Sequence, residues 1–195
     1  SAATTWTPGK SAIAGGKPKK RRETVQNMEN REKFQELFKA WVKRPGASEL
    51  LAWLETTDFF EAPASTRHHG SYPGGLVAHS LNVCRELMAS MTCDASTESR
   101  VVCALLHDVC KIGVYHPETK RRRDAATGRW EDYQGYTFRD PFPFGHGEKS
   151  VYLISRFIRL TDEEALAIRW HMGAYDDAAR GGSRTLSEAM SVSPL

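Results

Sequence analysis

The stretch VVCALLHDVCKIG, residues Val101–Gly113, places a histidine and an aspartate side by side in an otherwise apolar segment that is expected to be helical. Burying an imidazole and a carboxylate costs several kcal/mol unless each finds a partner, and an ionised carboxylate needs a cation or a full set of hydrogen-bond donors. The chain must therefore fold so that partners lie opposite His107 and Asp108. Backbone donors with a nearby basic side chain would serve, and so would a metal ion.

Helical periodicity runs through most of the remaining chain and predicts an all-α fold. Apolar residues recur at spacings of three and four within segments that glycine or proline ends. The pattern T-x-x-E at Thr161 and Glu164 is a capping box that starts the last long helix, which Gly173 ends. The helices are expected over residues 28–44, 50–54, 76–91, 98–112, 147–160 and 161–172. The 76–91 helix is expected to be buried, because apolar residues occur on nearly all its faces.

The pattern changes between Val114 and Phe144, where polar and aromatic residues flank a Thr-Gly turn. Such a turn between polar and aromatic flanks predicts a β-hairpin. We therefore expect a helical bundle with one small β-hairpin insertion at about residues 115–140. The aromatic residues Trp130, Tyr133 and Tyr136 could stack on a nucleic-acid base, or they could anchor the hairpin to the body.

The length and composition fit one globular domain with a tail. The 195 residues are 40% hydrophobic and 26% charged, and no apolar run approaches the roughly 20 residues of a membrane span. Residues 1–27 are predicted to be a flexible basic N-terminal tail, and residues 28–195 a single helical domain. No signal-peptide pattern is present. We expect a cytoplasmic protein with no membrane partner, and the sequence predicts no oligomeric state.

The four cysteines form no C-x-x-C pair. Three of them fall within apolar helical patterns, which favours reduced core thiols over disulfides. A zinc site combining Cys103, His107 and Cys110 remains an alternative, because residues i, i+4 and i+7 share one face of a helix.

The net charge is +3, but the charge is unevenly placed, and the dense basic clusters are Lys17–Arg22 and Lys120–Arg123. Both clusters could meet phosphates. The alternative for each is a solvated tail or a charged loop.

Four of the seven histidines fall on separate expected helices: His79, His107, His146 and His171. A single histidine of this kind is more often structural, whereas a set of four beside a buried aspartate is harder to explain by packing. Imidazole and carboxylate suit divalent Mn, Fe, Co, Ni and Zn, and converging helices can supply ligands to one shared core site. The set therefore predicts a metal site.

The stretches GGLVAHSLNV, LLHDVCK, GHGEKS and RWHMG together resemble the HD-domain metal-dependent phosphohydrolases. Within that superfamily the chain is most similar to the branch of the YhaM-type 3′-to-5′ exoribonucleases and to phage-type HD hydrolases. The resemblance covers roughly Met28 to the end of the sequence. It implies an HD-type helical bundle that holds one or two divalent ions, which could be Mn, Fe, Co, Ni or Zn, with Mg also possible.

The same resemblance implies roles for individual residues. His79, His107 and Asp108 match the ligands of a first metal, with Asp108 bridging, and His146 and His171 match those of a second. Asp108 and Lys111 are then the catalytic residues. Phosphate contacts are expected from Lys111, Lys149 and Arg121. Lys111 could instead be a cation that stabilises the end of its helix.

Two functions follow. The first is a phosphohydrolase that cleaves a phosphomonoester or phosphodiester of a nucleotide or nucleic acid by a metal-activated hydroxide. The alternative is a non-catalytic module that binds a nucleotide or nucleic acid on the same fold. Histidines that merely pack in the core are a third interpretation.

One element of the family pattern is missing. Its last aspartate usually lies on a helix after the final histidine, in a context resembling HLAD, and the sequence ends at EAMSVSPL without one. Asp176 could substitute, the first metal site could be incomplete, or the sequence could stop short of that helix. We expect that the sequence stops short of that helix, and this explanation predicts an exposed apolar face near residues 190–195.

Overall fold

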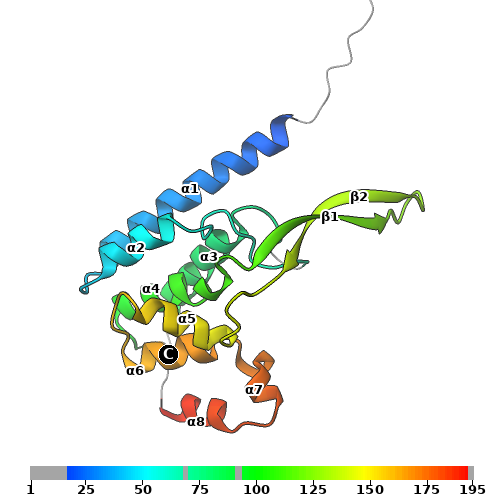
Figure 1. The fold of residues 1–195 in the computed structure, drawn as a ribbon. Helices are drawn as coiled ribbons and strands as arrows, with labels where there is room; N and C mark the ends of the chain where they lie inside the picture. The colour runs from blue at the N-terminus through cyan, green and yellow to red at the C-terminus, as the bar shows by residue number, and fades with distance from the viewer. Residues whose placement is uncertain (1–16, 68–69, 91–93, 193–195) are drawn as a thin grey trace, which may run out of the picture.

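A computed structural model of the protein describes residues 17–67, 70–90 and 94–192, and it is mainly helical with one hairpin (Figure 1). The prediction of a mainly helical fold with a small hairpin insertion is confirmed. The elements are α1 (Lys17–Trp41), α2 (Ala47–Glu55), α3 (Gly75–Ala89), α4 (Thr97–Leu106), the 3-10 helix η1 (Val109–Lys111), β1 (Tyr115–Arg123), β2 (Trp130–Phe138), α5 (His146–Ser155), α6 (Asp162–Trp170), the 3-10 helix η2 (Gly173–Tyr175), α7 (Asp177–Arg180) and α8 (Thr185–Val192). None of the helices described combines the length and apolar character that crossing a membrane requires.

Aromatic packing fixes α1 against the rest of the body. Phe34 and Phe38 lie on one face of α1 and are almost completely buried. The Phe34 ring meets the edges of Phe59 and Phe60, with ring centroids 5.1 and 5.4 Å apart. Burying one such side chain contributes about 1.5–3 kcal/mol. This face therefore holds α1 against the connection between α2 and α3.

The helix α1 begins at Lys17, earlier than the start near Met28 that the sequence predicts. Lysine, arginine and glutamate are good helix formers, and extending an existing helix costs little once its core-facing part has docked. Residues 22–26 are exposed, so the hydrophobic pattern could not reveal this part of the helix. The rest of the predicted tail, residues 1–16, lies outside the described residues.

The helix α4 ends at Leu106, whereas the sequence predicts one helix through Ile112. Asp108 has backbone angles of φ −104° and ψ 16°, which interrupt the α-helix before η1 begins. The Lys111 N–H then donates to the Asp108 carbonyl in a tighter 3-10 turn. The His-Asp pair therefore lies at the end of a helix and not within one.

The predicted start of α6 is confirmed. The Thr161 side chain accepts from the Glu164 N–H, and the Glu164 carboxylate accepts from the Thr161 N–H. The same carboxylate receives two hydrogen bonds from the Arg44 guanidinium, at 2.7 and 2.9 Å. Glu164 is fully buried, so this pair ties the connection between α1 and α2 to the start of α6.

The hairpin projects from the helical body (Figure 1). Its register runs from Tyr115 opposite Phe138 at the base to Arg123 opposite Trp130 near the tip. The predicted Thr-Gly turn is confirmed, with the Asp124 carboxylate accepting from the Thr127 N–H and Gly128 at φ +69°.

Several smaller expectations concern burial. The helix α3 is buried along one side only, because Met88 is 39% exposed, so the expectation of a helix buried on nearly all faces is wrong. Cys84, Cys103 and Cys110 are buried and form no disulfide among the described residues, as predicted for core thiols, and Cys93 lies outside those residues. Met190 and Val192 are exposed, which agrees with the apolar surface expected near 190–195 for the part that the structure describes.

Candidate metal centre

Four helices bring the predicted histidines to the Asp108 carboxylate. His79 comes from α3, His107 caps the end of α4, His146 is the first residue of α5, and His171 caps the end of α6. The Asp108 side chain is only 2% exposed. The structure thus brings together all of the residues that the sequence predicts as metal ligands.

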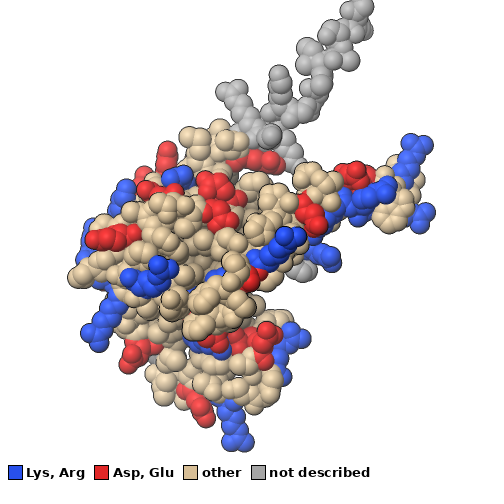
Figure 2. Space-filling view, in the orientation of Figure 1, with Lys and Arg blue, Asp and Glu red and all other residues tan. Residues whose placement is uncertain are grey.

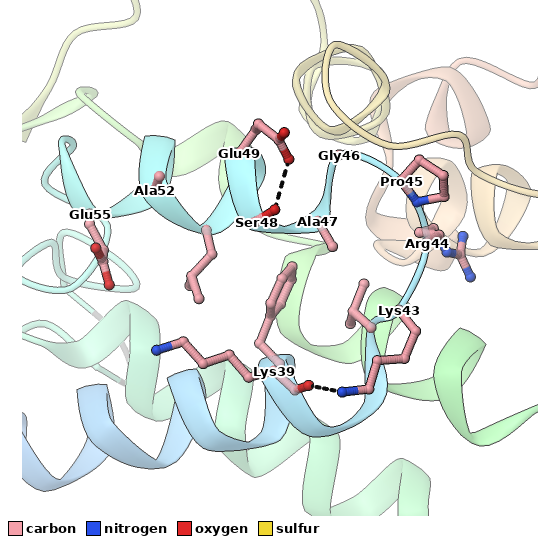
Figure 3. A pocket seen from close by; sticks show the side chains of 13 residues that line it. Lys39, Lys43, Arg44, Pro45, Gly46, Ala47, Ser48, Glu49, Ala52 and Glu55 are labelled. Atoms are coloured by element: carbon pink, nitrogen blue, oxygen red, sulfur yellow. Dashed lines mark hydrogen bonds between the residues drawn. The ribbon is translucent and has the colours of Figure 1, made fainter.

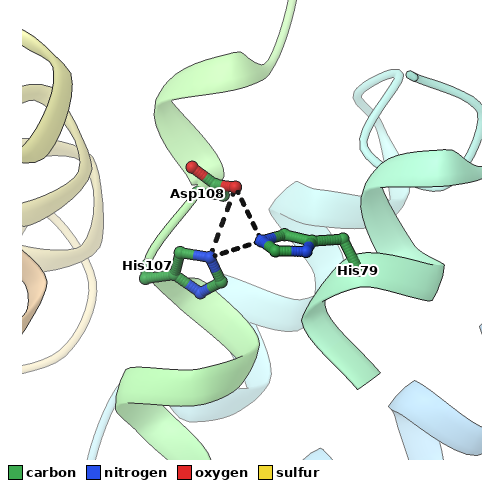
Figure 4. Close-up of side chains that lie close together, drawn as sticks. All are labelled: His79, His107 and Asp108. Carbon is green, nitrogen blue, oxygen red and sulfur yellow. Dashed lines mark hydrogen bonds and ion pairs between the residues drawn. The ribbon is translucent and has the colours of Figure 1, made fainter. Parts of the chain in front are cut away.

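One oxygen of Asp108 faces the first pair of histidines (Figure 4). The Nε2 atoms of His79 and His107 each lie 3.3 Å from Asp108 Oδ2, and they lie 3.0 Å from one another. Two imidazole nitrogens and a carboxylate oxygen at this separation could hold one metal ion.

The other oxygen of Asp108 faces the second pair. His146 Nε2 lies 3.0 Å and His171 Nε2 3.5 Å from Asp108 Oδ1. These atoms form a second group that could hold a metal ion. Both groups share Asp108, so its carboxylate would be a ligand in either of them.

Hydrogen bonds to the backbone orient two of the rings. His107 Nδ1 lies 3.0 Å from the Ala104 carbonyl, and His171 Nδ1 lies 2.7 Å from the Ile168 carbonyl. A carbonyl only accepts, so each Nδ1 must carry the proton, and each Nε2 lone pair is left facing the centre. This is the arrangement usual for metal-binding histidines.

The His171 Nε2 atom supplies a direct test of whether a metal fits. It is buried and has no hydrogen-bond partner. Leaving a buried polar atom unpaired costs about 1–3 kcal/mol. A metal ion at the second group would give this lone pair a partner, so the residues present fit a metal.

Asp108 is negatively charged in this environment. Burial alone would raise its pKa, but the neighbouring histidines, His107 foremost, hold the pKa well below the ordinary value. The Lys111 ammonium also donates to Asp108 Oδ2 at 2.8 Å. The carboxylate is therefore available as an anionic ligand at neutral pH.

The cysteines do not take part in either group. Burial, followed by the negative charge of Asp108, raises the pKa of Cys110 to about 12, so its thiol is neutral. Cys103 points its sulfur toward the Glu164 carbonyl at 3.9 Å. Among the described residues, the groups able to hold a metal contain only histidine and aspartate, which argues against a zinc site of Cys103, His107 and Cys110.

A hollow of about 530 Å³ opens onto the centre. Its walls include His79, His107, Asp108, Lys111 and His171. The rest of its lining is largely apolar. Sites for small molecules usually have volumes of roughly 300–1,000 Å³ and combine an apolar lining with a few polar groups.

A larger hollow of about 720 Å³ lies between α1 and α2 (Figure 3). Its polar lining includes Lys39, Lys43, Glu49 and Glu55. Lys43 donates to the Lys39 carbonyl and Ser48 to Glu49. No histidine lines this hollow, so the one beside Asp108 is the better candidate for a site that includes a metal ion.

Two predicted phosphate contacts lie elsewhere. Lys149 is buried and donates to Asp140 at 2.6 Å, so its charge is already paired. Arg121 lies on the projecting hairpin, 3.3 Å from Asp132. Neither lines the hollow at the centre, whereas Lys111 does.

Asp176 does not join the histidines. Its Oδ1 accepts from the Ala178 N–H at 2.9 Å and caps α7, and its Oδ2 accepts from Arg169 at 2.8 Å. This argues against Asp176 as a substitute for the aspartate missing from the family pattern.

Sequence reasoning missed the residues that join α5 to α6. A Cβ atom on Gly147 would lie 2.1 Å from the Arg169 carbonyl oxygen, so only glycine permits this contact. Arg169 also pairs with Glu148 at 2.5 Å. The only sequence signal is the glycine beside His146, because ion pairs between separate helices follow no spacing rule.

Comparisons of the chain with protein-family models, with curated proteins and with solved structures found no match. The centre is defined by its own geometry, an aspartate that turns one oxygen toward each of two histidine pairs.

Proposed function

We propose that the protein is a metal-dependent phosphohydrolase with an HD-type helical fold. It would cleave a phosphomonoester or phosphodiester of a nucleotide or nucleic acid. The observation that carries the proposal is the Asp108 carboxylate, buried and shared between the two histidine pairs. A purely structural role would leave the His171 Nε2 atom without a partner, which favours a ligand at the centre.

Divalent cations in such sites polarise a phosphoryl oxygen and make an attacking water more acidic. His79, His107 and Asp108 would hold one cation, and Asp108, His146 and His171 the other. The predominance of imidazole favours Mn, Fe, Co, Ni or Zn over Mg.

The protein's own groups would bind and orient the substrate. The Lys111 ammonium lies at the wall of the hollow beside Asp108, where it would neutralise charge on a phosphate oxygen. The apolar lining would exclude water from the remaining surface of the substrate. Asp108 stays ionised and acts as a ligand, because its pKa is held low by the surrounding histidines.

The test is an Asp108→Asn variant, with Asp94→Asn as the matched control because Asp94 is exposed. Metal content is measured by elemental analysis, and hydrolysis of p-nitrophenyl phosphate and bis(p-nitrophenyl) phosphate is measured with added Mn. We expect Asp108→Asn to lose bound metal and to lose more than about 100-fold in activity, since changes to groups that merely support ligands already cost 10–100-fold. Activity that persists in Asp108→Asn would refute the assignment.

One contact favours the alternative of a non-catalytic binding module. Lys111 already pairs with Asp108 at 2.8 Å, so the carboxylate has a partner even without a metal. This alternative requires nucleotide or nucleic-acid binding that survives metal removal and yields no product. Assays of binding and of turnover on the same preparation separate the two functions.

A further inference from the structure

The hairpin, residues 115–138, lies along the chain between two segments of the metal centre, and we call it the arm. The chain enters the arm shortly after Lys111 and returns shortly before His146. The base is closed by a hydrogen bond of 2.9 Å from the Arg139 N–H to the Val114 carbonyl. The base of the arm is therefore joined directly to the segments that carry Lys111 and His146.

The outer part of the arm carries an aromatic side chain that is mostly exposed. Trp130 is 63% exposed and lies opposite Arg123, next to the turn. Anchoring the arm to the body, one of the two explanations for its aromatic residues, therefore does not apply to Trp130. An exposed aromatic ring is a surface on which a nucleic-acid base can stack.

Arginines lie against the aromatic rings on both faces of the arm. The Arg121 guanidinium lies 5.8 Å from the centre of the Trp130 ring, and that of Arg122 lies 5.1 Å from the Tyr133 ring. Because successive strand residues point to opposite faces, each face presents one such pair. Each pair combines a π surface with a cation.

The arginines remain available to a phosphate. Arg121 pairs with Asp132 and Arg122 with Glu131, but more than 60% of each arginine side chain is exposed. Exposed pairs of this kind contribute only about 0–1 kcal/mol, so a phosphate can compete for these arginines. Figure 2 shows basic side chains along the arm and at its tip, with acidic ones between them.

We propose that the arm binds single-stranded nucleic acid and guides one end of it to the metal centre. Stacking on the exposed ring of Trp130 requires an exposed base face, which a single strand offers and a duplex hides. From Tyr115 to Arg123 the strand rises about 25 Å at roughly 3.3 Å per residue. A mononucleotide cannot span that distance, whereas a stacked strand of about eight nucleotides can.

Guiding a strand end to the centre serves a purpose only in a phosphohydrolase, so this inference rests on the proposed function. Its test measures binding alone. Fluorescence anisotropy is recorded in EDTA with labelled oligouridylate and oligothymidylate of about 12 nucleotides, a length within the usual range of single-strand sites. A dinucleotide and a duplex serve as comparison probes. The two 12-nucleotide probes show whether the sugar matters.

Trp130→Ala should weaken binding of the longer probes by roughly tenfold, the typical effect of losing one stacked base. Trp41→Ala is the matched control, because Trp41 is 44% exposed at the end of α1. Arg121→Gln should reduce the slope of log K against log salt by about 0.7, the value for one phosphate contact to a single strand. Arg85→Gln, an exposed arginine on α3, should leave this slope unchanged.

The proposal is supported if the long single strands bind best and only the arm variants are impaired. It is overturned if the wild-type protein binds no single strand, binds the duplex equally well, or binds equally after both arm substitutions. Circular dichroism confirms that each variant is folded. Failure of the phosphohydrolase proposal appears separately, as an absence of nitrophenyl phosphate turnover, so the two failures are distinguishable.

Discussion

The Arg169 guanidinium lies 2.8 Å from Asp176 Oδ2, and this ion pair joins the end of α6 to the start of α7. The same guanidinium meets Glu148 on α5. Arg169 therefore connects the segments that carry His146 and His171, whose ring centroids lie 5.0 Å apart. The relative position of the second histidine pair depends on this connection.

Replacing Arg169 should weaken the second metal group and spare the first. We expect Arg169→Gln to lower affinity at one of two sites by roughly 10–100-fold, the usual effect of removing a group that supports a ligand. Isothermal titration with Mn or Zn measures both sites. Arg156→Gln is the control, because Arg156 is an exposed arginine at the end of α5. Identical isotherms for Arg169→Gln and the wild type would contradict this role.

Metal binding should stabilise the fold. A ligand present at about 100 times its Kd contributes about 2.7 kcal/mol per site, so adding Mn or Zn should raise the Tm of the wild-type protein, and EDTA should reverse the change. Asp108→Asn should show no such shift, because both groups lose their shared carboxylate. Differential scanning calorimetry with and without metal makes the comparison, and a shift of equal size in the variant would exclude the site.

Acid should remove the contribution of the buried Arg44–Glu164 pair. Burial would raise the pKa of Glu164, but hydrogen bonds from Arg44 and the Thr161 N–H hold it below the ordinary value of 4.5. Since the pKa is lowered in the folded state, the stabilisation is fully present above pH 4.5 and is lost as the pH falls below it. Glu164→Gln should cost about 3 kcal/mol at neutral pH and progressively less in acid.

Chemical denaturation at a series of pH values tests this expectation. Glu163→Gln is the matched control, because Glu163 is exposed in the same helical turn. The free energies of unfolding of the wild type and Glu164→Gln are compared at each pH. If the difference between them stays constant below pH 4.5, the ionised carboxylate does not stabilise the fold.

The aromatic contact of α1 should dominate the docking of that helix. Phe34→Ala removes a fully buried ring and should cost about 3–5 kcal/mol. Trp41→Ala on the same helix should change the free energy of unfolding by less than about 0.5 kcal/mol, because Trp41 is partly exposed. Urea denaturation monitored by circular dichroism compares them, and equal losses in both variants would mean that Phe34 adds nothing specific to docking.

The residues of the candidate metal centre could be predicted because each belongs to a local pattern. His79 and His171 lie on helices with clear periodicity, and His107 and Asp108 stand out as polar residues in an apolar segment. The end of α4 at Leu106 could not be predicted, because Asp108 leaves the helical conformation to reach partners on α5 and α6. Local propensity carries no information about those partners.

Charged residues were harder to place. Lys149 follows His146 closely in sequence, yet its ammonium is turned to Asp140 and away from the hollow. Arg169 and Glu148 have no sequence signature, because their partners come from other helices. Ion pairs of this kind depend on tertiary packing, and a single sequence therefore gives little indication of them.

The closed base of the arm has a consequence for how the protein can vary. Val114 and Arg139 are joined by a backbone hydrogen bond, so the chain leaves and re-enters the helical body at one point. Lengthening a connection whose ends are already held together costs little entropy, since each doubling of length adds only about 0.6 kcal/mol. The segment between these residues can therefore be shortened, extended or replaced by another hairpin while Asp108 and its histidines keep their positions.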